Sequence, residues 1–155
     1  MDNQPIVIER LFNAPASLLW KALTNKDEMK NWYFNLAEFK AEPGFRFQFS
    51  GGPSPEKQYT HLCEVTEVVP EKKLAYSWRY EGYPGISYVS FELAPQGDKT
   101  LLTLTHTGLA SFPHDNPDFD ASNFIKGWNG IINKSLAAYI EKAESASHPV
   151  AGATR

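Results

Sequence analysis

The chain of 155 residues has very little cysteine, and Cys63 carries its only thiol. One thiol excludes an internal disulfide and a metal cluster of several thiolates. No apolar run approaches the roughly 18 residues that a membrane-spanning helix requires. The opening Met-Asp-Asn-Gln-Pro lacks the basic and apolar regions of a secretory signal peptide. These absences predict a cytoplasmic protein without a membrane span.

The sequence also lacks a large excess of charge of either sign. The chain mixes 15 Lys and Arg residues with 18 Asp and Glu residues, and its formal net charge is −3. Nucleic-acid binding requires a basic face or stripe on the protein. We therefore expect no nucleic-acid partner.

Motifs of the common catalytic sites are missing as well. The sequence has no Gly-x-Ser-x-Gly nucleophile elbow and no paired Cys and His motif. Gly51-Gly52 is not followed by the lysine and helix of a phosphate-binding loop. Glu64 lies an odd number of residues from His61 and Cys63 on the same predicted strand. Its side chain is therefore expected to lie on the opposite face and to point to solvent. The sequence predicts no catalytic residue, no metal and no cofactor.

The stretch from Ile8 to Thr24 carries the clearest structural pattern. A strand-type run, Ile6–Phe12, stops at Asn13-Ala14-Pro15, and a helix-type pattern follows at once. Proline suits the first helical turn because its missing N–H has no partner there. Apolar residues then recur at helical spacing, namely Leu18, Leu19, Ala22 and Leu23. The pattern predicts a strand, a tight corner and a short amphipathic helix.

In the rest of the chain the spacing of apolar residues changes twice, from helical to alternating and back to helical. A second short helix is expected from about Lys26 to Tyr33, with Thr24 as its cap. Alternation and turn residues then predict strands at Leu36–Lys40, Phe45–Ser50, Tyr59–Val69, Lys73–Tyr80, Ile86–Leu93 and Thr100–Thr107, with a loop at Gly51–Pro55. Phe124, Trp128 and Ile131 share one face of a long helix from about Asp118 to Lys142.

This order predicts an α+β fold. A curved antiparallel sheet of about six or seven strands needs one face covered, and the long C-terminal helix can cover it. Two short helices follow the first strand. We expect residues 1–143 to form a single domain and residues 144–155 to form a flexible C-terminal tail.

Several short motifs follow one another in a specific order from about Pro5 to Lys142. They are Arg10-x-Phe12-x-Ala14-Pro15, Leu19-Trp20-x-Ala22-x-Thr24, Trp32, Pro43-Gly44-Phe45-Arg46-Phe47, Pro70-Glu71-Lys72-Lys73-Leu74-x-Tyr76-x-Trp78, Val89-x-Phe91-x-Leu93 and Gly127-Trp128. The set resembles the Bet v 1/START-like (SRPBCC) superfamily and its helix-grip fold. More narrowly, it resembles the family named for activator of Hsp90 ATPase homologues.

The resemblance implies a cavity between the sheet and the long helix. The ligand is expected to be a small, mostly apolar molecule. The volume of the cavity is expected to be on the order of several hundred Å³. The namesake co-chaperones stimulate the chaperone ATPase, so a chaperone is the alternative partner. A cyclase-type or hydrolase-type enzyme with an inward histidine is the third hypothesis. Members of the family are often monomers or dimers, and we expect a monomer or homodimer here.

The candidate ligand-binding residues are large side chains predicted to face this space. Core packing alone is the favoured explanation for any single one of them, whereas Trp and Tyr can also line a pocket and form hydrogen bonds at its mouth, which favours a binding role for the set. The set is Trp32, Phe47, Phe49, Trp78, Tyr80, Val89, Phe124, Trp128 and Ile131. Phe34 and the Gly51–Pro55 loop are expected to border the mouth.

Two histidines complete the candidate set. His61 and His106 lie on predicted strands, at positions whose alternation turns them inward. An inward histidine can orient a polar ligand group, act as an acid or base, or form a purely structural hydrogen bond. His61, Cys63 and His106 offer three metal-ligating atoms, but no spacing motif supports a metal site. The leading hypothesis is non-enzymatic binding of a small apolar or amphipathic molecule.

Overall fold

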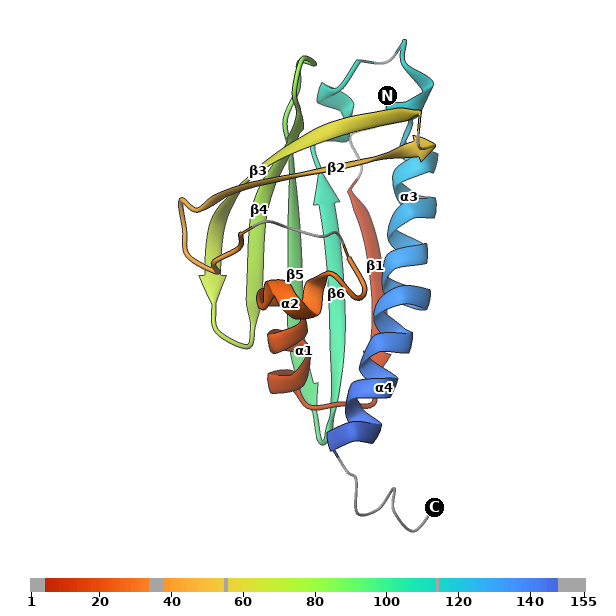
Figure 1. Ribbon diagram of the computed structural model, residues 1–155. Coiled ribbons are helices and arrows are strands. Elements are labelled where there is room, and N and C mark those ends of the chain that lie inside the picture. Colours follow the sequence, from red (N-terminus) through yellow and green to blue (C-terminus); the bar gives the residue numbers. More distant parts are fainter. Residues whose placement is uncertain (1–4, 34–37, 55, 114, 148–155) are drawn as a thin grey trace.

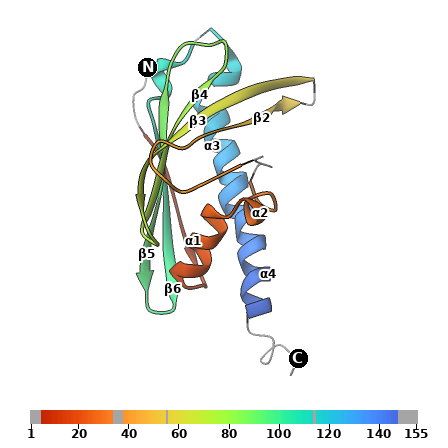
Figure 2. The ribbon, with the colours of Figure 1, turned by 60° about the vertical axis from the view of Figure 1, so that its left-hand side comes forward.

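The computed structural model describes residues 5–33, 38–54, 56–113 and 115–147, without the side chains of residues 52–54 and 144–147. Its sheet has six antiparallel strands in the order β1-β6-β5-β4-β3-β2. The strands are β1 (Ile6–Phe12), β2 (Arg46–Ser54), β3 (Lys57–Val69), β4 (Lys73–Tyr80), β5 (Ser87–Gln96) and β6 (Lys99–Thr107). The C-terminal helix and two short helices lie on one face of the sheet (Figure 1), and β2 and β3 curve over toward that face (Figure 2). The predicted helix-grip architecture is confirmed.

Alternation of buried and exposed side chains explains why the sheet has one covered face. Each strand places every second residue toward the helices. In β5 and β6 the inward residues are buried and directly paired, Val89 with His106, Phe91 with Leu104 and Leu93 with Leu102. Their outward neighbours are more exposed, so the core lies between the sheet and the helices.

The corner after β1 forms as the sequence predicts. Helix α1 (Ala16–Thr24) starts after Pro15, whose carbonyl accepts hydrogen bonds from the backbone of Leu18 and Leu19. Helix α2 (Lys26–Met29) is capped by Asn25, which accepts from the next turn, and not by Thr24 as expected. The Thr24 hydroxyl instead donates to the carbonyl of Trp20, which occupies it within α1.

The C-terminal helix is continuous but changes its winding. It comprises α3 (Ala121–Gly130), a π-helical segment η3 (Ile131–Leu136) and α4 (Ala137–Ser147). It begins later than expected because Pro117–Phe119 form a separate 3₁₀ turn, η2, and Asp120 caps α3. Another 3₁₀ turn, η1 (Leu109–Ser111), precedes it. No helix in the described ranges is long and apolar enough to cross a membrane.

Two hydrogen bonds hold the second half of this helix, η3 and α4, against the N-terminal elements of the chain. Arg10 Nη1 on β1 donates to Asn133 Oδ1 in η3 at 3.2 Å. Tyr139 Oη on α4 donates to Glu28 Oε1 on α2 at 2.8 Å. The buried residues Ile132, Leu136 and Ile140 pack there without access to water. The lower helix is therefore close to the sheet and short helices.

Two local predictions are wrong. The expected loop at Gly51–Pro55 is strand up to Ser54, because the β2 and β3 pairing continues through Gly51 and resumes at Ser54 after an irregularity. The expected strand at Leu36–Lys40 is absent from residues 38–40, and residues 36–37 lie outside the described residues, as does Phe34. Composition favoured a turn at the glycines, but the sheet edge holds them extended.

Candidate binding pocket

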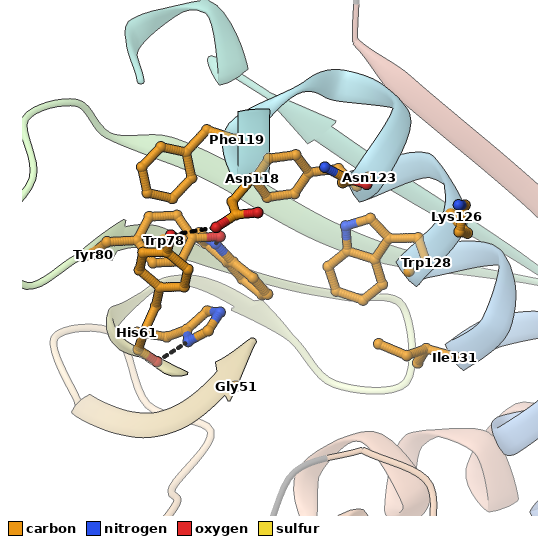
Figure 3. A pocket seen from close by; sticks show the side chains of 13 residues that line it. Gly51, His61, Trp78, Tyr80, Asp118, Phe119, Asn123, Lys126, Trp128 and Ile131 are labelled. Carbon is orange, nitrogen blue, oxygen red and sulfur yellow. Dashed lines mark hydrogen bonds between the residues drawn. The ribbon is translucent and has the colours of Figure 1, made fainter. Parts of the chain in front are cut away.

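A pocket of about 530 Å³ lies between the upper part of α3 and the facing ends of β3 and β4. This volume matches the size expected from the sequence. Figure 3 shows side chains from the sheet and from the helix converging on it. The lining residues are Gly51, Tyr59, His61, Trp78, Tyr80, Asp118, Phe119, Asn123, Phe124, Lys126, Gly127, Trp128 and Ile131.

The structure places six of the eleven predicted site residues in the pocket wall. They are His61, Trp78, Tyr80, Phe124, Trp128 and Ile131. The other five lie in the packed core around it, namely Trp32, Phe47, Phe49, Val89 and His106. That these residues contact a ligand stays a prediction.

The five core residues are occupied by contacts with the protein itself. Trp32 Nε1–H donates to the carbonyl of Ala22 at 3.0 Å and ties the turn after α2 to α1. The ring of Phe47 packs against Tyr76, and that of Phe49 stacks on His61 at 4.5 Å. Val89 and His106 are fully buried. Strand alternation was correct for the four residues that lie on strands, but other protein side chains fill the space beside them.

Sequence reasoning missed several wall residues, and only some left a signal. Tyr59 shares strand parity with His61, so the same alternation argument applies to it. Gly127 follows Phe124 by three residues, so a helical wheel places it beside the apolar face of α3. Lys126 follows Phe124 by two residues and lies away from that face, so the helical period gives no signal for it. Asp118 and Phe119 come from the η2 turn, for which no periodic pattern exists, and Asn123 lies in the first turn of α3, where it donates to the carbonyl of Pro117.

The wall is mainly aromatic, and its indole N–H groups are already used. Trp78 and Trp128 lie with ring centroids 5.5 Å apart. Trp78 Nε1–H donates to Tyr80 Oη at 2.9 Å, and the ring of Tyr80 contacts Phe119 at 4.8 Å. Since the indole donors are satisfied inside the protein, the rings present largely apolar surface to the pocket.

A directional hydrogen-bond chain holds Trp128 in this wall. Trp128 Nε1–H donates to His106 Nδ1 at 2.9 Å, which leaves the imidazole proton on Nε2. His106 Nε2–H then donates to Ser87 Oγ at 2.8 Å, and Ser87 donates to the carbonyl of Trp78 at 2.9 Å. Burial lowers the pKa of His106 to about 3. His106 is therefore neutral, and both of its ring nitrogens are engaged with the protein.

His61 is part of the wall and is also held neutral. Its Nδ1–H donates to the carbonyl of Tyr59 at 3.0 Å. Its ring stacks on Phe49 and meets the edge of Trp78 at 4.9 Å. Burial lowers its pKa to about 4. At neutral pH this histidine adds no charge to the pocket.

A polar cluster fixes the η2 turn at the rim. Tyr59 Oη donates to Asp118 Oδ2 at 2.6 Å, and Lys57 Nζ lies 2.9 Å from the same oxygen. The hydrogen bonds from Tyr59 and Lys57 lower the pKa of the Asp118 carboxyl. Asn116 Nδ2 donates in turn to Tyr59 Oη at 3.4 Å. These contacts tie the turn before α3 to the start of β3.

The residues that the structure describes contain no group of three His, Cys, Asp or Glu side chains able to hold a metal ion. Cys63 is buried, and its burial raises the pKa of the thiol. The thiol therefore stays protonated, which disfavours it as a metal ligand or nucleophile. His61, Cys63 and His106 do not form the three-ligand set that their parity allowed.

Comparison with known proteins gives one partial sequence match. A 63-residue segment is 36% identical to the mitochondrial import inner membrane translocase subunit TIM50 of Danio rerio. That segment is 39% of this chain and 16% of that protein. The likeness is thus local, and this chain spans a small part of that relative's length.

Solved structures match over nearly the whole described fold. Protein MLL2253 from Mesorhizobium loti is 26% identical with a TM-score of 0.73, covering 90% of this chain and 98% of that one. BH1534 from Bacillus halodurans is 26% identical with a TM-score of 0.68, covering 88% and 96%. DynU16, from the dynemicin biosynthetic locus, is 20% identical with a TM-score of 0.74, covering 92% of this chain but 49% of its own.

The family comparison agrees with the fold and with the sequence resemblance. Residues 13–141 match the family described as Activator of Hsp90 ATPase homolog 1-like protein. The match runs from the corner after β1 to α4, so it includes every element that builds the pocket. The chain therefore belongs to the Activator of Hsp90 ATPase homolog 1-like family.

Proposed function

We propose that this protein binds a small apolar or amphipathic molecule in the pocket between α3, β3 and β4. The observation that carries the proposal is a 530 Å³ space with a mainly aromatic wall. Ligand pockets are of this size, and most of their surface is apolar with a few placed polar groups. Tyr80, Asp118 and Lys126 are polar groups of this kind.

Binding without turnover fits the chemistry of the described wall residues. A hydrolase or cyclase needs a nucleophile or a titrating acid or base in contact with the substrate. The described wall has no serine or cysteine, its carboxylate Asp118 is held by Tyr59 and Lys57, and His61 is neutral with a pKa of about 4. His106 does not line the pocket and is engaged at both nitrogens. A chaperone partner is suggested by the family alone and stays a prediction.

A pocket-filling substitution tests the proposal. A Cβ placed on Gly127 would meet no atom within 4 Å, and Gly127 lines the pocket. Gly127→Leu therefore adds a side chain at the pocket wall without a clash at its Cβ. We expect it to weaken binding of the fluorescent apolar probe N-phenyl-1-naphthylamine by on the order of tenfold or more. Native mass spectrometry of the purified protein would show whether a co-purified molecule is lost as well.

The chain offers a matched control in the same helix. Gly130 is also helical, a Cβ there meets no atom within 4 Å, and Gly130 is outside the pocket wall. Gly130→Leu should leave probe binding unchanged. Either change removes a helical glycine, which raises helix propensity by up to about 1 kcal/mol, so loss of helix propensity does not explain a loss of probe binding. Equal binding by Gly127→Leu and wild type would refute the proposed site.

A further inference from the structure

The charges around the pocket mouth are not balanced. Asp118 is the wall carboxylate, and Lys57 neutralises it at 2.9 Å while Tyr59 occupies the same oxygen. Lys126 is the wall cation, and it is exposed on α3. Among the described residues, no carboxylate pairs with Lys126. The mouth therefore carries one unmatched positive charge.

Lys126 and Asp118 lie at different places along the rim. In Figure 3 the indole of Trp128 lies between them, with Asp118 beside Phe119 and Lys126 further along α3. A group bound at Lys126 is thus kept away from the Asp118 carboxylate. The chain as a whole has a net charge of −3, so the attraction for an anion must come from this local lysine.

The interior favours acceptor atoms on the ligand for an independent reason. Tyr80 Oη accepts the hydrogen bond from Trp78 Nε1, so its own proton is available for donation. In the described part of the chain no acceptor takes that proton, and Tyr80 is 4% exposed. Burial also raises the pKa of Tyr80, so the hydroxyl remains a donor at neutral pH.

From these two observations we infer that the ligand is an acidic amphipathic molecule, with its apolar or aromatic body against Trp78 and Trp128 and its anionic group at Lys126. The inference rests on the proposed function and specifies its ligand class. Lys126 acts as a specificity-determining residue: it selects the acidic compound from neutral compounds of the same shape. The ammonium group stays partly hydrated at the rim, so its effect on affinity is modest.

Two fluorescent probes of almost identical shape test the inference. N-phenyl-1-naphthylamine is neutral, and 1-anilinonaphthalene-8-sulfonate adds one sulfonate to the same ring system. Their dissociation constants are measured by fluorescence titration on wild type, Lys126→Gln, Lys126→Arg and Lys134→Gln. Lys134 is a matched control because it is exposed on the same continuous helix but does not line the pocket.

Lys126→Gln should weaken binding of the sulfonate probe about threefold to fivefold, as expected for a partly exposed ion pair. Binding of the neutral probe should change by a smaller factor, because that probe carries no charge for Lys126 to attract. Lys126→Arg and Lys134→Gln should keep the wild-type ratio of the two constants. Raising the salt concentration from about 0.02 M to about 0.5 M should remove most of the difference between wild type and Lys126→Gln.

The failures of the inference and of the proposed function give different results. If wild type binds both probes and Lys126→Gln leaves their ratio unchanged, Lys126 does not select an anion and the inference is overturned. If wild type binds neither probe, the proposed binding function fails as well. If Gly127→Leu leaves sulfonate binding intact, that probe binds elsewhere and the inference is likewise overturned.

Discussion

Single polar atoms decide how the aromatic wall is held. The chain of hydrogen bonds from Trp128 through His106 and Ser87 to the carbonyl of Trp78 has one consistent direction, and every member has a partner. A buried network of this kind stabilises the fold only when it is complete, because an unpaired buried group costs more than a paired one contributes. His106 is thus a positioning residue for Trp128.

His106→Ala is expected to lower the free energy of unfolding by about 2–4 kcal/mol. The change leaves the Trp128 N–H without its acceptor and opens a cavity in the core. Urea denaturation followed by tryptophan fluorescence measures the loss. The double variant with Trp128→Phe removes both partners, so it should be less destabilised than the two single changes combined. Strict additivity would mean that the pair is not coupled.

Among the elements, the η1 turn is fastened to the turn between β4 and β5. Ser111 Oγ accepts from the backbone N–H of Ile86 at 2.9 Å. Gly85 has a φ of 104°, and a Cβ there would lie 2.4 Å from the carbonyl oxygen of Ser111. The close approach holds the chain that leads from β6 toward η2 and the pocket rim. Glycine is required at this contact by its conformation and its size.

Gly85→Ala should destabilise the protein by about 1–3 kcal/mol more than Gly82→Ala does. Both glycines have positive φ, but a Cβ on Gly82 meets no atom within 4 Å. The difference between the variants therefore isolates the clash with Ser111 from the cost of the backbone conformation. Thermal or urea unfolding of both proteins checks it. Equal stabilities would show that η1 moves away at little cost.

Alternation found the strands that build the pocket but not all of their ends. Inward parity was correct for His61, Trp78 and Tyr80 because a half-covered sheet repeats every two residues. It could not reveal that Gly51 continues β2, since backbone pairing with Tyr59 holds that segment extended. The η2 turn, which supplies Asp118, has no repeat that a sequence could display.

At the scale of the whole molecule, periodicity predicted which faces meet but not how far apart they lie. The same inward face of the sheet contributes Val89 to the packed core and Trp78 to the pocket wall. Which inward residues line the pocket depends on the distance between the sheet and the C-terminal helix. Arg10 and Tyr139 hold the η3 and α4 segments of that helix in place. Family membership predicted the fold, because related sequences share one architecture. It left the ligand open, because related folds carry different sites.

The whole molecule should also become less stable in mild acid. His61 and His106 have folded-state pKa values of about 4 and about 3, both lowered by burial. Below about pH 6.5 the two histidines become protonated in the unfolded chain but stay neutral in the folded protein. The free energy of unfolding therefore falls as the pH drops below that value. We expect a loss of about 2–4 kcal/mol between about pH 7 and about pH 5, measured by urea denaturation at each pH. His61→Phe keeps a ring against Phe49 and removes one titrating group, so its loss should be about half as large. An unchanged pH dependence in that variant would exclude His61 as a source of the acid sensitivity.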